Sequence, residues 1–126
     1  MDHVLLAVTG PELVAGSTRL KAGTATKLLL NALSTTAFIT LGKVYRGRMV
    51  DVRPTNEKLR ARATRMVVEL TGVAPREARR LLDAAHHEVK LALAMHFTGL
   101  SADEARLQLE RQSLRALAPS RKRRAR

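Results

Sequence analysis

The sequence contains no cysteine and no tryptophan, and aromatic residues make up only 2% of its 126 residues. The lack of cysteine excludes disulfides and thiolate metal sites, and it suits a reducing cytoplasm, where we expect the protein to reside. With so few aromatic rings, the core must be built from Leu, Val, Ala and Met. No apolar run reaches the roughly 18 residues of a membrane span, so we expect no membrane association.

Acidic residues are also scarce: 11 Asp and Glu stand against 23 Lys and Arg, which gives a formal net charge of +12. Five of the basic residues fall within residues 119–126, which have no large apolar side chain to anchor them. This run predicts a disordered, solvated tail. The basic residues of segment 58–65 are not interleaved with aromatic rings that could stack on bases, so nucleic acid is not an expected partner.

The most informative segment is residues 10–27, which combine glycine, serine, threonine and cations. Pro11 and Gly16 predict a loop, and Ser17 or Thr18 can cap the helix that follows. The free backbone N–H groups of a helix start, together with the positive end of its macrodipole, suit a phosphate dianion. The segment therefore predicts an anion site at the start of a long helix.

The same segment resembles the signature shared by the N-acetylmuramic acid 6-phosphate etherases and glucokinase regulatory protein, most clearly in Gly16-Ser-Thr-Arg-Leu-Lys-Ala-Gly-Thr-Ala25. Segments 41–45, 49–59 and 88–93 resemble the bacterial etherases rather than the regulatory protein. The resemblance covers roughly residues 2–118. Members of this family are longer by about one sugar-isomerase (SIS) domain on the N-terminal side. A truncated gene, a mis-assigned start or a split protein would each explain this difference in length.

The resemblance implies a mainly α fold in three parts. Residues 1–54 would be the C-terminal remnant of an α/β SIS domain, with a buried strand at 3–8 and a long helix over about 18–41. Residues 55–118 would be a C-terminal helical module that includes a small three-helix, ubiquitin-associated-like bundle, and 119–126 the basic tail. In a complete SIS domain the uncharged stretch 28–42 would lie on the sheet and against a partner subunit, so a homodimer or self-association is expected.

Apolar spacing predicts the helices of residues 55–118 more directly. The first is expected to run from the N-cap Thr55 to Gly72, with one apolar stripe formed by Leu59, Ala63, Met66, Val67 and Leu70. The others are expected to begin at Pro75, to span about 88–97 with His96 on the apolar side, and to run from the capping box Ser101–Glu104 to about Ala116. Segment 43–54 is predicted to be an extended connection.

The resemblance implies that the whole protein is a carbon–oxygen lyase. It would cleave the D-lactyl ether of N-acetylmuramic acid 6-phosphate, giving N-acetylglucosamine 6-phosphate and D-lactate in cell-wall amino sugar recycling. The family uses no cofactor, and its acid and base are two glutamates upstream of the signature with no counterpart here. We therefore expect no catalytic residue in this chain and no turnover by it alone. The alternative is a non-catalytic sugar-phosphate-binding or regulatory SIS fragment.

Four residues are expected to bind the sugar 6-phosphate substrate. Ser17 and Thr18 can hold phosphate or sugar oxygens, and Lys21 projects from the first helical turn as a point charge. Glu12 is expected to support the loop or to contact sugar hydroxyls.

Other polar residues are expected to be structural. Arg19 should point away from Lys21 and tie the loop to its domain, and Lys27 lies two turns further along the helix. His86 and His87 are adjacent and hence on different helix faces, with no carboxylate at the i+4 spacing of a zinc pair. No metal site is predicted.

Overall fold

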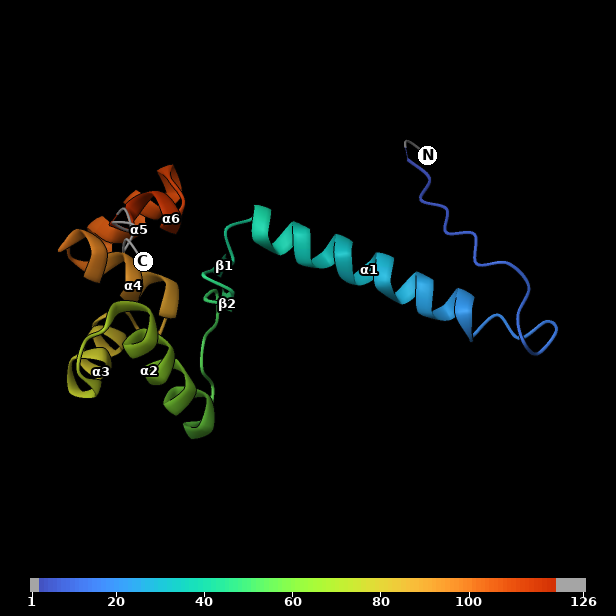
Figure 1. The fold of residues 1–126 in the computed structure, drawn as a ribbon. Coiled ribbons are helices and arrows are strands. Elements are labelled where there is room, and N and C mark those ends of the chain that lie inside the picture. Colours follow the sequence, from blue (N-terminus) through green and yellow to red (C-terminus); the bar gives the residue numbers. More distant parts are fainter. Residues whose placement is uncertain (1–2, 120–126) are drawn as a thin grey trace, which may run out of the picture. The chain divides into compact units, whose positions relative to one another are not determined.

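The computed structural model describes residues 3–119, and this part of the chain is mainly α, as predicted (Figure 1). The chain divides into two compact units, one up to Leu41 and one from Gly42 onward. The predicted tail lies outside the described residues except for Pro119. None of the helices within residues 3–119 is both long and apolar enough to cross a bilayer. The elements, in order, are α1 (Lys21–Thr40), β1 (Val44–Tyr45), β2 (Arg48–Met49), α2 (Glu57–Thr71), α3 (Pro75–Ala84), α4 (Val89–Thr98), α5 (Ala102–Arg111) and α6 (Leu114–Leu117).

The N-terminal unit begins with irregular chain, so the strand predicted at residues 3–8 is wrong. Val4, Leu6 and Val8 are 75%, 82% and 84% exposed. A β-strand is stabilised by backbone hydrogen bonds to a neighbouring strand. The only strands among the described residues, β1 and β2, pair with each other, so residues 3–8 have no strand beside them.

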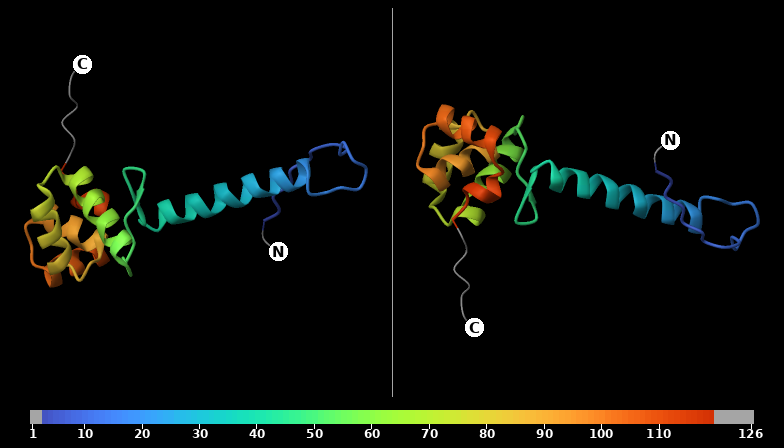
Figure 2. Two further views of the ribbon diagram at one scale, coloured as in Figure 1. Left: turned by 90° about the horizontal axis from the view of Figure 1, so that it is seen from below. Right: turned by 90° about the horizontal axis from the view of Figure 1, so that it is seen from above.

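The long helix of this unit, α1, is one continuous element in both views of Figure 2. It begins at Lys21, three residues later than predicted, and ends at Thr40. No residue of α1, all of which the structure describes, is buried.

A short hairpin occupies residues 44–49 of the connection that was predicted to be extended over 43–54, and residues 50–54 have no helix or strand. Strands β1 and β2 pair antiparallel, with Tyr45 opposite Arg48. The two turn residues, Arg46 and Gly47, have φ values of 47° and 74°, as in a type I′ turn, which favours glycine at its second position. Two-residue strands are too short to show an alternating pattern, so the glycine was the one local signal of this turn.

The second unit has a single hydrophobic core that draws on the hairpin segment and on all five of its helices. Tyr45 and Val50 are 4% and 0% exposed, so residues on both sides of the turn pack with the helices. The predicted stripe of α2 is confirmed for four of its five residues: Ala63, Met66, Val67 and Leu70 are buried, and Leu59 is half-buried. The family-based division at residues 54 and 55 is a statement about the complete protein and stays a prediction.

Helix α4 lies at the centre of this unit, between the α2–α3 pair and the α5–α6 pair (Figure 1). The expected one-sided stripe is wrong, because both Leu91 and Ala94 are buried in addition to Val89, Ala92 and Leu93. His96, expected on the apolar side, is exposed. A helix that packs against neighbours on several sides needs apolar residues on most of its surface, and the polar residue then marks the remaining face.

The helix ends follow local side-chain chemistry, but one predicted cap is wrong. The N-cap of α2 is Asn56 rather than Thr55, and its Oδ1 accepts a hydrogen bond from the Leu59 N–H at 2.9 Å. Gly72 ends α2 in the left-handed conformation, φ 82°, as predicted. The capping box at Ser101 and Glu104 is confirmed.

The last predicted helix is divided in two. Helix α5 ends at Arg111, and Ser113 caps the separate short helix α6 by accepting from the Ala116 N–H. Serine offers the backbone a hydrogen bond that competes with helix continuation, which explains the break.

Candidate functional site

The start of α1 is the predicted anion site, but neither Ser17 nor Thr18 caps it. The N-cap position is Leu20, whose side chain has no hydrogen-bonding group. The chain before it forms turns, with Ser17 N–H donating to Val14 O at 3.0 Å and Thr18 N–H to Gly16 O at 3.2 Å. Because these residues lie outside the helix, their side chains are not held over its first turn, and the capping prediction is wrong.

Glu12 instead supplies the anion at this helix start. Its two carboxylate oxygens accept hydrogen bonds from the Ala22 N–H at 2.9 Å and the Lys21 N–H at 3.0 Å. These bonds, that of Ala22 foremost, and the charge of Lys21 lower the pKa of the Glu12 carboxyl. A carboxylate is favoured here because first-turn N–H groups lack intrahelical acceptors and the helix dipole is positive at this end. The expected loop-supporting role of Glu12 is confirmed, and a contact with sugar hydroxyls stays a prediction.

The two hydrogen bonds from the Lys21 and Ala22 N–H groups to Glu12, which we call the Glu12 clamp, close the loop between residues 12 and 21. A broad surface groove of about 760 Å³ lies beside this loop. The groove is lined by Glu12, Arg19 and Lys21 among others, but not by Ser17 or Thr18. Lys21 and Thr18 are exposed and Ser17 is half-buried. The structure therefore brings together two of the four predicted binding residues, and the roles of Ser17 and Thr18 stay predictions.

The structure places Arg19 differently from the prediction. It was expected to point away from Lys21, because residues two apart on a helix lie on different faces. Arg19 precedes the helix, however, so that rule does not apply, and its side chain lines the same groove as Lys21. The signal that could have identified it is the pair of cations itself, Arg19 and Lys21, flanking a helix start.

The rest of α1 presents apolar surface. The segment 28–42 has no charged residue. Leu29 is half-buried, and the other large apolar residues of the segment are between 42% and 64% exposed: Leu28, Leu30, Leu33, Phe38, Ile39 and Leu41. Apolar side chains exposed along the length of one helix are typical of an interaction surface.

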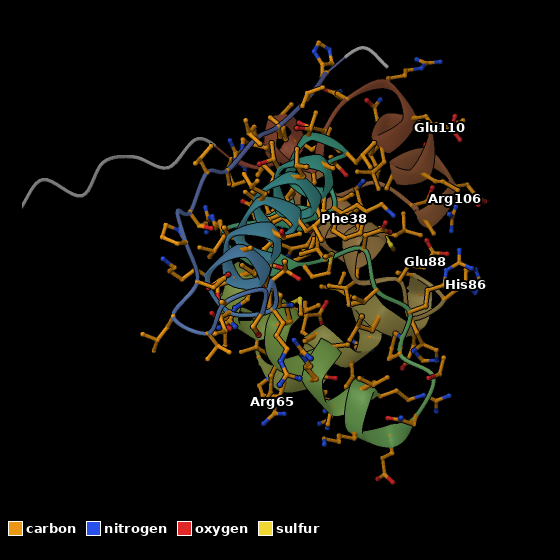
Figure 3. All side chains as sticks on the ribbon, turned by 90° about the vertical axis from the view of Figure 1, so that its right-hand side faces the viewer. Phe38, Arg65, His86, Glu88, Arg106 and Glu110 are labelled. Atoms are coloured by element: carbon orange, nitrogen blue, oxygen red, sulfur yellow. The ribbon has the colours of Figure 1, made fainter. Side chains whose placement is uncertain are left out.

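Two of the segments that carry the family resemblance, 49–59 and 88–93, meet in the second unit. Arg53 donates to Glu88 Oε1 at 2.7 Å. Arg106 of α5 donates to the same oxygen at 3.1 Å, and Figure 3 labels these two side chains, Glu88 and Arg106. The Arg106 hydrogen bond is the main cause of a lowered pKa of the Glu88 carboxyl. Glu88, which precedes α4, thus ties together three separate parts of the unit, and we interpret the cluster as structural.

The histidines do not sit as expected. His86 and His87 follow the end of α3 and have φ values of 50° and 63°, so they are not on helix faces. Asp83, four residues before His87, does face it, with Oδ1 3.7 Å from the imidazole Nδ1. Within residues 3–119 there is no group of three or more His, Cys, Asp or Glu residues that could hold a metal ion.

By fold and site, the chain is a mainly helical protein whose long helix starts at a carboxylate-clamped, cation-lined loop. No protein-family model matches it. It is, however, 59% identical over 110 residues to N-acetylmuramic acid 6-phosphate etherase of Synechocystis sp., a match that covers 87% of this chain and 36% of the relative. The etherases of Nostoc punctiforme and Rubrobacter xylanophilus are 57% and 51% identical, over 94% and 92% of this chain.

The predicted resemblance is thereby confirmed: the chain is similar to the C-terminal part of N-acetylmuramic acid 6-phosphate etherases. The matches cover 36%, 39% and 38% of these three relatives, so the chain spans little more than a third of their length.

Proposed function

We propose that this chain is the C-terminal part of an etherase that cleaves the D-lactyl ether of N-acetylmuramic acid 6-phosphate, releasing N-acetylglucosamine 6-phosphate and D-lactate. The observation that carries the proposal is the 57% identity over 121 residues to a protein of that name. A match that covers 94% of this chain extends well beyond one short motif.

Substrate binding is the contribution that this part can make. Arg19 and Lys21 line one groove, and two cations beside a helix start favour a phosphate group. The Glu12 clamp restricts the loop that carries Ser17 and Thr18, which would lower the entropy lost when these residues order around a sugar phosphate. Since Glu12 already accepts from the Lys21 and Ala22 N–H groups, the substrate phosphate would rely on the side chains of Lys21 and Arg19 rather than on those two amides.

The chemistry itself would come from residues that this chain does not contain. An elimination needs a base for the proton at C2 and an acid for the leaving oxygen at C3, each within hydrogen-bond reach. In the proposal both are glutamates in the part of the relatives that this chain does not span, and no cofactor takes part.

The exposed apolar face of α1 supports the expectation that this unit is completed by further protein. In the proposal, residues 1–54 complete a SIS domain whose sheet and partner subunit cover segment 28–42, and a cytoplasmic homodimer results. The C-terminal helices would form the ubiquitin-associated-like module. We expect the 126-residue chain alone to self-associate in sedimentation experiments, and a compact monomer would contradict this part of the proposal.

The test is D-lactate release from N-acetylmuramic acid 6-phosphate, measured for this chain with and without the remaining part of an etherase supplied as a second polypeptide. We expect turnover only with both parts. Lys21→Ala should then weaken substrate binding by roughly ten- to a hundredfold, the effect of one charge-assisted contact. Lys27→Ala, two turns along α1, is the control and should change binding little.

The alternative function is non-catalytic sugar-phosphate binding, and the same experiment separates the two. Binding of N-acetylglucosamine 6-phosphate without D-lactate release, in the presence of the second part, would favour the alternative. Turnover by the 126-residue chain alone would overturn the assignment of acid and base and would bring Glu12 back as a catalytic candidate.

A further inference from the structure

A hollow between α2 and α3 takes no part in the proposed function. Its volume is about 640 Å³, which is within the range of small-molecule sites. Arg60 and Arg65 of α2 and Arg79 of α3 line it. We call this hollow the arginine groove. It is formed within the second unit, where α2 and α3 pack side by side (Figure 1).

The three arginines of the groove have no carboxylate partner among the described residues. Other arginines of the same unit do: Arg48 pairs with Glu69 at 2.7 Å, and Arg53 with Glu88 at 2.7 Å. Three arginines against two carboxylates, Glu57 and Asp83, leave the lining of this hollow with an excess of positive charge, which favours an anion. The planar fork of arginine suits the oxygens of a phosphate group in particular.

The remaining lining of the groove argues against a bare anion as its ligand. Ala63 and Leu82, which are 2% and 4% exposed, give it an apolar floor. Glu57 and Asp83 also line it, and the His87 imidazole lies 3.7 Å from Asp83. Carboxylates accept hydrogen bonds from hydroxyl and amino groups, which a phosphate dianion lacks. A ligand that matches the arginines, the carboxylates and the apolar floor has a phosphate, several hydroxyl groups and an apolar ring face.

We infer that the arginine groove is a second binding site, for a phosphorylated sugar, separate from the start of α1. The guanidinium groups of Arg60, Arg65 and Arg79 hold the phosphate, Glu57 and Asp83 accept from the sugar hydroxyls, and the ring packs on Ala63 and Leu82.

The test measures binding of glucose 6-phosphate to the full 126-residue chain by calorimetry, with glucose and inorganic phosphate as separate arms. All proteins in this test carry Lys21→Ala, so that the site proposed at the start of α1 contributes little to the measured binding. The result therefore does not depend on whether the proposal for that site is correct. We expect the ester to bind more tightly than inorganic phosphate and glucose to bind least. In backbone NMR spectra, the ester should shift amides of α2 and α3 but not those of residues 17–22.

A pair of charge-matched variants identifies the site. Arg60→Gln/Arg65→Gln/Arg79→Gln removes the three groove cations and should weaken binding about tenfold or more. Arg62→Gln/Arg76→Gln/Arg111→Gln removes the same charge from residues that do not line the groove, and should weaken it about twofold or less. Far-UV circular dichroism checks that both variants keep the helical content of the parent.

Three results would overturn the inference. Equal losses in the two variants would mean general attraction to a basic surface. Equal affinity for inorganic phosphate and the ester would remove the sugar from the proposal. An absence of any measurable binding at millimolar glucose 6-phosphate would remove the site.

Discussion

Helices α1 and α4 are both rich in leucine and alanine and carry few charges, yet they lie in different surroundings. Leu93 of α4 is 0% exposed, whereas Leu33 of α1 is 52% exposed. The difference is that α4 contacts α2, α3, α5 and α6, while α1 has no buried residue. Apolar composition therefore creates the need for burial, but only facing apolar surfaces satisfy it.

The two units also hold their loops in different ways. In the second unit, ion pairs and the hydrophobic core act together: Glu88, with a side chain 21% exposed, bonds to Arg53 and Arg106 beside buried Val89. In the N-terminal unit, the Glu12 clamp stands without a core beneath it. The stability of the second unit should thus respond to substitutions far more than that of the first.

The largest effect is expected from Leu93→Ala. Truncating a fully buried leucine removes apolar contacts and leaves a cavity, which costs about 2–5 kcal/mol of unfolding free energy. Leu33→Ala in α1 is the matched control and should change the unfolding free energy by less than about 0.5 kcal/mol. Urea denaturation followed by circular dichroism gives both values. Equal losses would show that α1 has a core of its own.

A smaller loss is expected from Glu88→Gln, about 1–2 kcal/mol, since its hydrogen bonds go to charged but partly exposed groups. The folded-state pKa of Glu88 is lowered, so its contribution is complete above the unfolded pKa and is lost as pH falls through the folded pKa. Thermal melts from neutral to acidic pH should therefore show the wild type approaching the variant at low pH. A constant difference across this range would contradict the assignment.

His86→Gly should stabilise the second unit by about 1 kcal/mol. A non-glycine residue at φ 50° is strained, and glycine removes the strain at some cost in chain entropy. Ala84→Gly, within the last turn of α3, is the control and should destabilise by about 0.5–1 kcal/mol. The sign of the two changes, measured by chemical denaturation, is the readout.

The smallest effect on global stability is expected from Glu12→Gln, because the clamp lies at the surface of a unit without a core. The amide protons of Lys21 and Ala22 should exchange with solvent faster in the variant. Because the pKa of Glu12 is also lowered, the wild type should lose this protection as pH falls through that pKa. Unchanged exchange at both amides would mean that the clamp is not formed in solution.

Much of the helical module was predictable because its signals are local. The stripe of α2, its glycine end at Gly72 and the capping box at Ser101 each depend on residues within one or a few turns. The error at Asn56 arose because the neighbouring Thr55 offers a similar cap, so that the geometry of the entering chain selects between them. The break at Ser113 was missed because a serine within a helical pattern can either continue the helix or cap a new one.

The candidate site was predicted in part. The place of Lys21 in the first turn of α1, the loop before this helix and the resemblance to the etherases followed from the sequence. The role of Glu12 at the start of the helix did not follow from the sequence, since Glu12 lies nine positions before Lys21, whose N–H it accepts. Arg19 lines the same groove as Lys21 because α1 begins at Lys21, later than the sequence predicts.

The sequence by itself thus determined the mainly α character, the apolar stripe of α2 and the resemblance to the etherases. The tertiary structure alone decided that residues 3–8 form no strand, that α4 is buried on several sides, and that Glu12 rather than Ser17 or Thr18 meets the start of α1. The physical reason is common to these three: pairing, burial and clamping depend on residues distant along the chain, whose positions no local pattern specifies.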